Sequence, residues 1–294
     1  MQEMLSTPPS DDAFAEAARQ IRAAYPGLYD HQRAGIAFLL ARRRAILADD
    51  MGLGKTRQAI IAAREAAPAG PYLVICPAAV KLNWRREIRL VEPDADVQVI
   101  DGDRAVEDGR RWTIINYDLL RRVEDRLLAT AWGGIVIDEA HYIKNDSQRS
   151  ARVLGLLEVR EGRQAVAEPE VVYLLTGTPM SNRPRDLFNL LKAVRHPLAT
   201  SFYNYARRYC AAYDNGFGLD TNGASNLEEL AEIISGVLLR RTKVRRSISR
   251  RSSGPGSRSR SPRRRSAAWR RERSTTWSSI RPARAAPGSP FWRC

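Results

Sequence analysis

Residues 47–60 read LADDMGLGKTRQAI, and the second half of this stretch has the composition of a phosphate-binding loop. Gly52 and Gly54 allow backbone N–H groups to turn towards phosphate oxygens, and the dipole of a following helix strengthens the attraction. We expect Lys55 to neutralise the β- and γ-phosphates of ATP and the Thr56 hydroxyl to hold Mg²⁺. The competing interpretation is a glycine-rich turn that precedes Lys-Thr by chance.

Short apolar runs alternate with helical periods on both sides of this loop. The alternation predicts an α/β fold with a mostly parallel sheet and helices on both of its faces. It also places the loop between a strand and a helix, which is the context that a phosphate-binding loop requires. The strand-like runs are Ala45–Ala48, Tyr72–Cys76, Val97–Ile100, Thr113–Ile115, Ile135–Ile137 and Val171–Leu175. The helical segments are Asp11–Ala24, Asp30–Arg43, Lys55–Ala67, Ala79–Leu90, Tyr117–Ala129, Ser147–Leu157, Arg185–Val194, Ser201–Ala212 and Leu227–Ile234.

A second candidate site lies in the sequence GGIVIDEAHYIKN, where two acids follow the apolar run Ile135–Ile137. Functional groups of parallel sheets gather at the carboxyl ends of the strands. We expect Asp138 to be the protein's partner of Mg²⁺, usually through water, and Glu139 to be the base that orients and deprotonates an attacking water. Taken alone, the two acids would also suit a helix start, where they stabilise the positive end of the dipole.

A third stretch, YLLTGTPMSNRP, follows the last of the apolar runs. Thr176 and Thr178 supply hydroxyl groups, while Gly177 and Pro179 favour a tight turn. By itself the stretch predicts a turn and nothing more. Its place near the end of the α/β unit makes a role in coupling a reasonable hypothesis.

Six stretches, taken in order, resemble the first RecA-like lobe of the Swi/Snf-type DNA-dependent ATPases, which belong to the helicase superfamily. They are LYDHQRAGIAFLL, DDMGLGKT, LVICPAAVKLNW, IINYDLL, VIDEAHYIKN and LLTGTPMSN, and the resemblance covers roughly residues 28–245. The family's loop usually reads DEMGLGKT. Asp49, five residues before Gly54, therefore stands where this family has an acid in place of the usual glycine, and Asp50 replaces its glutamate. The later run from Tyr205 to Lys243 resembles the annealing-helicase subgroup and its bacterial relatives.

The resemblance implies ATP and Mg²⁺ as cofactors and adds roles in the nucleotide site. Gln32 would bind the edge of the adenine, whereas without the family it reads as a solvated helix residue. His141 would link the hydrolysis site to the turn that contains Thr176 and Thr178, although an isolated histidine is more often structural.

The resemblance also implies double-stranded or branched DNA as a partner. The residues that match the family's first DNA-contacting motif are Pro77, Lys81, Asn83 and Trp84. Trp84 would suit the hydrophobic core equally well. Asn116 and Tyr117 match a second motif, which ends a strand near the DNA backbone, and Lys144 and Asn145 could face either DNA or solvent.

The formal charge of +15 belongs to the end of the chain. Seventeen basic residues and one acid lie between Arg241 and Cys294, so the remaining 240 residues are close to neutral. The segment after Lys243 is rich in Arg and Ser and has no apolar period, and such a composition predicts disorder. We expect three parts: an N-terminal helical lead at 1–24, the ATP-binding lobe at 25–245 and a disordered basic tail at 246–294.

The change of composition after Lys243 is abrupt. The family normally continues from this point towards a second RecA-like lobe, which supplies arginines that meet the γ-phosphate. The change indicates a shifted reading frame in a GC-rich gene, and the alternative is a natural Arg/Ser-rich tail that binds nucleic acid. On either interpretation we expect the chain by itself to hydrolyse ATP negligibly.

Several classes of protein are disfavoured. The chain lacks any run of 18 apolar residues, its start has no secretory pattern, and three widely spaced cysteines suggest neither disulfides nor a zinc site. We expect a monomer that associates with the nucleoid in a bacterium or lies in the nucleus of a eukaryote, with replication or repair proteins as further partners. The leading hypothesis is the ATP-binding lobe of a DNA translocase. The alternatives are a nucleotide- or DNA-binding fragment without turnover and a basic-tailed binding protein in which the lobe is a scaffold.

Overall fold

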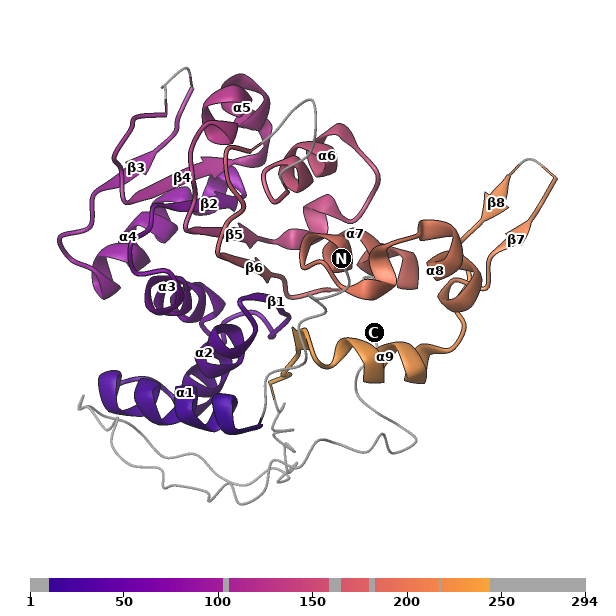
Figure 1. The fold of residues 1–294 in the computed structure, drawn as a ribbon, viewed down its shortest axis with the longest axis horizontal. Helices are drawn as coiled ribbons and strands as arrows, with labels where there is room; N and C mark the ends of the chain where they lie inside the picture. Colours follow the sequence, from indigo (N-terminus) through magenta and orange to yellow (C-terminus); the bar gives the residue numbers. More distant parts are fainter. Residues whose placement is uncertain (1–10, 103–105, 159–164, 180–182, 217, 244–294) are drawn as a thin grey trace, which may run out of the picture. The chain divides into compact units, whose positions relative to one another are not determined.

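The computed structural model describes residues 11–102, 106–158, 165–179, 183–216 and 218–243 (Figure 1). The described residues up to Thr242 form one compact unit. Helix α1 packs on α2 within this unit, so the boundary predicted after residue 24 stays a prediction. The predicted tail at 246–294 lies outside the described residues.

Seven of the described strands form one parallel sheet in the order β3-β4-β2-β5-β6-β1-β9. This arrangement confirms the predicted α/β fold with a parallel sheet. Successive strands of a parallel sheet need a crossover connection, and helices supply it between β1 and β2, between β2 and β3, between β4 and β5, and between β5 and β6. The strands are β1 Arg44–Leu47, β2 Tyr72–Cys76, β3 Val97–Val99, β4 Trp112–Asn116, β5 Gly134–Asp138, β6 Val171–Leu175 and β9 Leu238–Leu239.

Helices cover both faces of the sheet, as Figure 1 shows. The side chains of β2 alternate between the two resulting cores: Tyr72 and Val74 pack with α1–α4, while Leu73 and Ile75 pack with α5–α9. Burying a large apolar side chain contributes about 1.5–3 kcal/mol, which is why strands buried on both faces read as continuous apolar runs. The helices are α1 Asp11–Ala24, α2 Asp30–Arg42, α3 Lys55–Ala66, α4 Lys81–Val91, α5 Leu120–Leu128, α6 Gln148–Gly155, α7 Phe188–Ala193, α8 Phe202–Tyr209 and α9 Leu227–Ile234.

The register of the sheet brings three loops to one edge. Leu175, at the end of β6, lies opposite Leu47 of β1 and opposite Asp138 of β5. The segments that follow these three strands therefore leave the sheet at the same level. They contain the phosphate loop, the Asp-Glu pair and the third motif.

The structure adds elements that the sequence did not predict. β9 pairs with β1 at the edge of the sheet, and β7 (Tyr213–Asp214) forms an antiparallel pair with β8 (Leu219–Asp220). Short 3₁₀ turns also follow three strands, at Ala78–Val80, Tyr117–Leu119 and Ala140–Ile143. Among the described residues, no helix has both the length and the apolar character that crossing a bilayer requires.

Candidate active site

The phosphate loop connects β1 to α3. Gly52 and Gly54 have φ angles of 79° and 74°, a left-handed conformation that glycine adopts without steric cost. Gly54 precedes the first turn of α3 and has no side chain that could accept hydrogen bonds from the helix. The first N–H groups of the helix therefore have no partner within it, and they present donors and a positive dipole to an anion.

Lys55 begins α3 and is half-buried. Its ammonium group donates hydrogen bonds to the carbonyl oxygens of Asp49, at 2.7 Å, and Asp50, at 3.3 Å. Burial lowers the pKa of Lys55, and nearby carboxylates oppose this shift, with Glu139 the strongest of them. The loop thus holds its cation at the base of the helix N-terminus, where the phosphates of a nucleotide would lie.

Gln32 lies against the phosphate loop. A Cβ atom placed on Gly54 would collide with the side-chain amide nitrogen of Gln32, so a larger residue there would have to displace that amide. The other end of the amide accepts a hydrogen bond from the backbone N–H of Tyr29, at 3.2 Å, and thereby caps helix α2. Gln32 is therefore more than a solvated helix residue, and its contact with adenine stays a prediction.

Asp138 is the last residue of β5, and two donors hold its carboxylate. The indole N–H of Trp84 donates to Oδ2 at 2.7 Å, and the backbone N–H of Glu139 donates to Oδ1 at 2.9 Å. Burial nevertheless raises the pKa of Asp138 above its usual value. Trp84 is a fully buried core residue that also orients this carboxylate.

Glu139 adopts φ 50° and ψ 52°, a left-handed conformation that costs a residue with a side chain roughly 1–2 kcal/mol. Strain of this kind concentrates at functional sites. Nδ1 of His141 lies 3.1 Å from Oε2 of Glu139, within ion-pair distance. Nδ1 of His141 is buried and has no hydrogen-bond partner among the described residues.

Tyr117, which directly follows β4, supports the same loop. Its hydroxyl donates to the backbone carbonyl of Asp138 at 2.6 Å, and its ring stacks on Tyr142 with 5.3 Å between the ring centroids. Burial raises the pKa of Tyr117 well above its usual value. The buried ring thus has a supporting role in this structure, and its predicted contact with DNA stays a prediction.

The third motif folds back onto the phosphate loop. Thr176 is fully buried, and its hydroxyl accepts a hydrogen bond from the backbone N–H of Thr178 at 3.1 Å. A Cβ atom on Gly177 would lie 3.5 Å from the side chain of Met51 and 4.0 Å from Nζ of Lys55. The motif therefore lies beside the cation that would contact the phosphates. Its predicted link through His141 stays a prediction.

The residues assigned to DNA differ in their exposure. The Lys81 ammonium is buried and donates hydrogen bonds to the carbonyl of Ile100 at 2.9 Å, to the side chain of Asn116 at 3.1 Å and to the carboxylate of Asp101. In this structure Lys81 and Asn116 join three elements of the fold, and neither presents its polar group to solvent. Asn83, by contrast, is exposed on α4.

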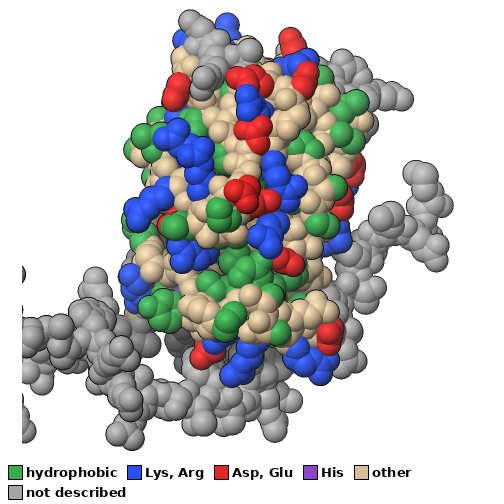
Figure 2. Space-filling model, turned by 90° about the vertical axis from the view of Figure 1, so that its left-hand side faces the viewer, with side chains coloured by type: hydrophobic (Ala, Val, Ile, Leu, Met, Phe, Trp, Pro, Cys, Tyr) green, Lys and Arg blue, Asp and Glu red, His purple; other side chains and the backbone are tan. Residues whose placement is uncertain are grey.

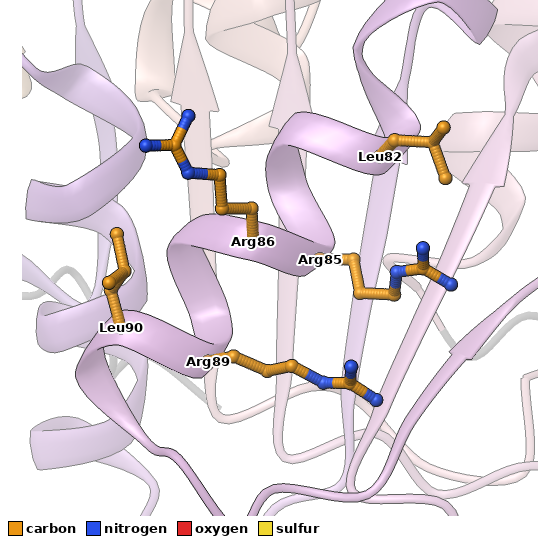
Figure 3. A pocket seen from close by; sticks show the side chains of 5 residues that line it. All are labelled: Leu82, Arg85, Arg86, Arg89 and Leu90. Atoms are coloured by element: carbon orange, nitrogen blue, oxygen red, sulfur yellow. The ribbon is translucent and has the colours of Figure 1, made fainter.

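The outward face of α4 bears three arginines and two exposed leucines around a shallow hollow (Figure 3): Leu82, Arg85, Arg86, Arg89 and Leu90. The residues that line this hollow are arginines and leucines, so it offers neither an acid nor a nucleophile for catalysis. Figure 2 shows the side of the molecule on which α4 lies, with basic and acidic side chains interspersed. We therefore place the active site at the phosphate loop.

The residues present fit Mg²⁺ and a nucleotide. Mg²⁺ is usually held by one or two carboxylates together with substrate phosphates and water, rather than by a cage of protein ligands. Within the described ranges, no group of three or more His, Cys, Asp or Glu side chains comes together as a metal cage. The hydroxyl of Thr56, the Asp138 carboxylate and the first N–H groups of α3 are groups of the kind that Mg·ATP would need, and their assignment to it stays a prediction.

A strand, a glycine-rich loop and a helix, joined by an Asp-Glu pair two strands away, define the class of RecA-like nucleotide-binding lobes. Within this class the chain belongs to the SNF2-related domain family, which matches residues 31–251. The family confirms the resemblance seen in the six sequence stretches.

Three proteins illustrate the similarity. The SWI/SNF-related matrix-associated actin-dependent regulator of chromatin subfamily A-like protein 1 of Bos taurus is 36% identical over 251 residues, which are 83% of this chain and 25% of that protein. The DNA annealing helicase and endonuclease ZRANB3 of Homo sapiens is 34% identical over 231 residues, covering 74% and 21% of the two chains. The solved Sulfolobus solfataricus SWI2/SNF2 ATPase core in complex with dsDNA has 30% identity and a TM-score of 0.60, covering 73% of this chain and 44% of that one. The chain therefore spans about a quarter or less of these two curated relatives.

Proposed function

We propose that this chain supplies the ATP-binding lobe of a DNA-dependent ATPase that couples ATP hydrolysis to movement on, or remodelling of, duplex DNA. One observation supports the proposal above the others. The sheet register brings the loop that holds Lys55 and the Asp138–Glu139 pair to one edge, where Glu139 is the carboxylate with the strongest effect on the pKa of Lys55. A cation for phosphates and a base for water thus lie within electrostatic reach of each other.

Each residue of the site has a distinct proposed role. Lys55 and the first N–H groups of α3 bind the phosphates, and Thr56 and Asp138 hold Mg²⁺, which would neutralise charge on the β- and γ-phosphates. Glu139 orients the attacking water and accepts its proton. Trp84 and Tyr117 keep the Asp138 loop in place through the hydrogen bonds described above.

Duplex DNA is the proposed partner. The solved relative is a complex with dsDNA, and the human relative is called a DNA annealing helicase. Exposed Asn83 is the residue of the predicted DNA set that this structure leaves accessible on α4. Branched DNA as a substrate, replication or repair proteins as partners, and a monomeric state are further proposals for experiment.

Replacement of Lys55 by alanine tests the nucleotide site. We expect Lys55→Ala to lose measurable Mg·ATP binding, because the loop loses the cation that faces the phosphates, while the circular dichroism spectrum stays unchanged. Lys192→Ala on α7 is the matched control, since it removes a half-buried lysine from the other side of the sheet. Isothermal calorimetry measures the affinities. Equal affinity in the folded Lys55→Ala variant would refute the phosphate assignment.

Turnover by the 294-residue chain is proposed to be negligible. An arginine that stabilises transition-state charge contributes about 10³–10⁵ in rate in phosphoryl transfer. Within the described residues, the arginine that contacts the phosphate loop, Arg241, is paired with Asp49. We propose that the transition-state arginine belongs to a part of such proteins that this chain does not span, since the chain covers 44% of the solved core.

Phosphate release, measured with and without duplex DNA, tests this proposal. We expect a rate at background level that Glu139→Gln leaves unchanged. This outcome would favour the nucleotide-binding fragment over a complete enzyme. DNA-stimulated hydrolysis that Glu139→Gln abolishes would show that the chain is catalytically sufficient.

A further inference from the structure

The acid that replaces glycine in the phosphate loop is fully buried. Asp49 has no solvent exposure. Burial of an ionised carboxylate costs free energy, because the carboxylate loses its hydration. A buried carboxylate therefore needs a cation or several donors nearby. The family resemblance accounts for the presence of an acid at this position, but it does not explain what the acid does.

Arg241 is the partner of this carboxylate, and it comes from the far end of the described chain. Its Nε donates to Oδ1 of Asp49 at 2.9 Å, and Nη2 contacts Oδ2, which makes a two-pronged ion pair. Nη2 also donates to the side chain of Gln58 at 3.0 Å, and Nη1 donates to the carbonyl of His31. Gln58, fully buried, donates in turn to the carbonyl of Leu53 at 2.9 Å. One guanidinium thus ties the phosphate loop to α2 and α3.

The backbone of the same segment follows the loop. Three N–H groups spaced two residues apart donate to carbonyls spaced two residues apart: Ile46 to Val237 at 2.8 Å, Ala48 to Leu239 at 2.7 Å and Asp50 to Arg241 at 2.9 Å. The pairing of β1 with β9 therefore continues beyond both strands into the phosphate loop. The segment 237–241 supports the loop along its whole first half.

Gly35 on α2 leaves the space that this cluster occupies. A Cβ atom at Gly35 would collide with Oε1 of Gln58 and lie 2.7 Å from Nη2 of Arg241. Both contacts are closer than real Cβ atoms show, so a side chain at position 35 would displace the guanidinium or the amide. Glycine at this position lowers the intrinsic stability of helix α2, because it has a lower helix propensity than alanine.

We propose that Arg241 is a positioning residue for nucleotide binding and that segment 237–241 latches the phosphate loop in its binding conformation. The proposal rests on the proposed function. Its physical link is Asp49, whose carboxylate binds Arg241 while its backbone carbonyl accepts the hydrogen bond of the Lys55 ammonium. Loss of the contacts with Arg241 would leave Asp49 free to move, and the Lys55 ammonium that its carbonyl orients would then lose its fixed position. Because coupling is reciprocal, a bound nucleotide also stabilises the pairing of segment 237–241 with the loop.

Two variants test the latch, one by removing both charges of the ion pair and one by added volume. The double variant Asp49→Asn, Arg241→Gln replaces the ion pair by two neutral amides, and Gly35→Ala displaces the cluster by volume alone. The matched control is Glu168→Gln, Arg195→Gln, which neutralises a bidentate ion pair in a different part of the fold. We expect both latch variants to bind Mg·ATP at least tenfold more weakly at a temperature where they are folded, and the control to bind normally.

Hydrogen exchange of the unaltered chain gives a readout that does not depend on any variant folding. Mg·ATP should slow exchange of the Ala48 and Asp50 amides at least tenfold, since both donate to segment 237–241, and this effect should be absent in the latch variants. Lower melting temperatures with unchanged affinity would show that the cluster is merely structural and would overturn the proposal. Unchanged exchange in the unaltered chain on addition of Mg·ATP would overturn it as well. If the unaltered chain fails to bind Mg·ATP, both the proposed function and the latch are refuted. If it binds Mg·ATP and the latch variants bind equally well, only the latch is refuted.

Discussion

At the scale of single residues, ionisation of Asp138 costs folding stability, while the proposed binding of Mg²⁺ needs the ionised form. Two donors bind its carboxylate, yet burial raises its pKa, so the folded chain binds this proton more tightly than the unfolded chain does. The stability that this group contributes is therefore fully present below its unfolded pKa and is lost as the pH rises through the raised, folded pKa. At neutral pH the ionised carboxylate is retained at a cost in stability, which is understandable if it serves Mg²⁺.

This asymmetry predicts a pH-dependent effect of Asp138→Asn. Without metal, we expect the variant to melt at a higher temperature than the unaltered chain at neutral pH, because the amide cannot ionise. The difference should shrink on acidification and vanish below the ordinary aspartate pKa of about 3.9, where the carboxylate of the unaltered chain is protonated in both states. Melting curves across this range measure it. A constant difference at every pH would mean that ionisation of Asp138 plays no part.

Individual residues also show where the sequence sufficed. The placement of the glycines, Lys55 and the Asp138–Glu139 pair could be predicted because it depends on local order: strand, turn and helix. The binding and catalytic roles of these residues stay predictions. The local sequence does not predict the contacts of Trp84 and Arg241, since each binds an acid that lies far away in the chain. The available signal for Arg241 was Asp49 itself, because an acid inside a buried loop requires a cation from somewhere.

At the scale of elements, the strong apolar runs were predicted to within a residue or two, and the short strands were missed. β9 has two residues, and its extended conformation depends on the edge of β1 rather than on its own pattern. β7 and β8 are equally short, with β7 exposed and β8 exposed at Leu219 only. A local apolar period cannot indicate a strand whose pairing partner supplies most of its stability.

Lys81 gives a prediction at this scale, because its amine joins α4 to the ends of β3 and β4. We expect Lys81→Met to lower the free energy of unfolding by about 1–3 kcal/mol, since the buried oxygen of Asn116 loses its donor. Asn83→Ala, on the same helix and exposed, should change it by less than about 0.5 kcal/mol. Urea denaturation measures both. A stable Lys81→Met variant that has lost DNA affinity would instead support the DNA contact that the family implies.

At the scale of the whole molecule, charge is separated from the site. Beyond Lys243 the sequence has fifteen arginines and one acid, whereas residues 1–243 are nearly neutral, and the face in Figure 2 interleaves both signs. A lobe of this kind has little long-range attraction for DNA. The excess positive charge that could attract DNA therefore lies after Lys243, whereas the candidate nucleotide site lies in the nearly neutral part of the chain before it.

This separation predicts how salt affects DNA binding. Each phosphate that a protein neutralises on duplex DNA contributes a slope of about −0.9 to the logarithm of affinity against the logarithm of salt concentration. We expect removal of residues 244–294 to flatten this slope sharply and to weaken binding at low salt, because the fifteen arginines are the main source of released counterions. Fluorescence anisotropy with a labelled duplex, titrated at several salt concentrations, measures both quantities. Mg·ATP affinity of the shortened chain is the control, and it should be unchanged because the loop, Asp138 and Arg241 all remain. A slope that survives the truncation would place the main DNA contacts on the lobe, and exposed positions on α4 such as Asn83 would then be the first to substitute.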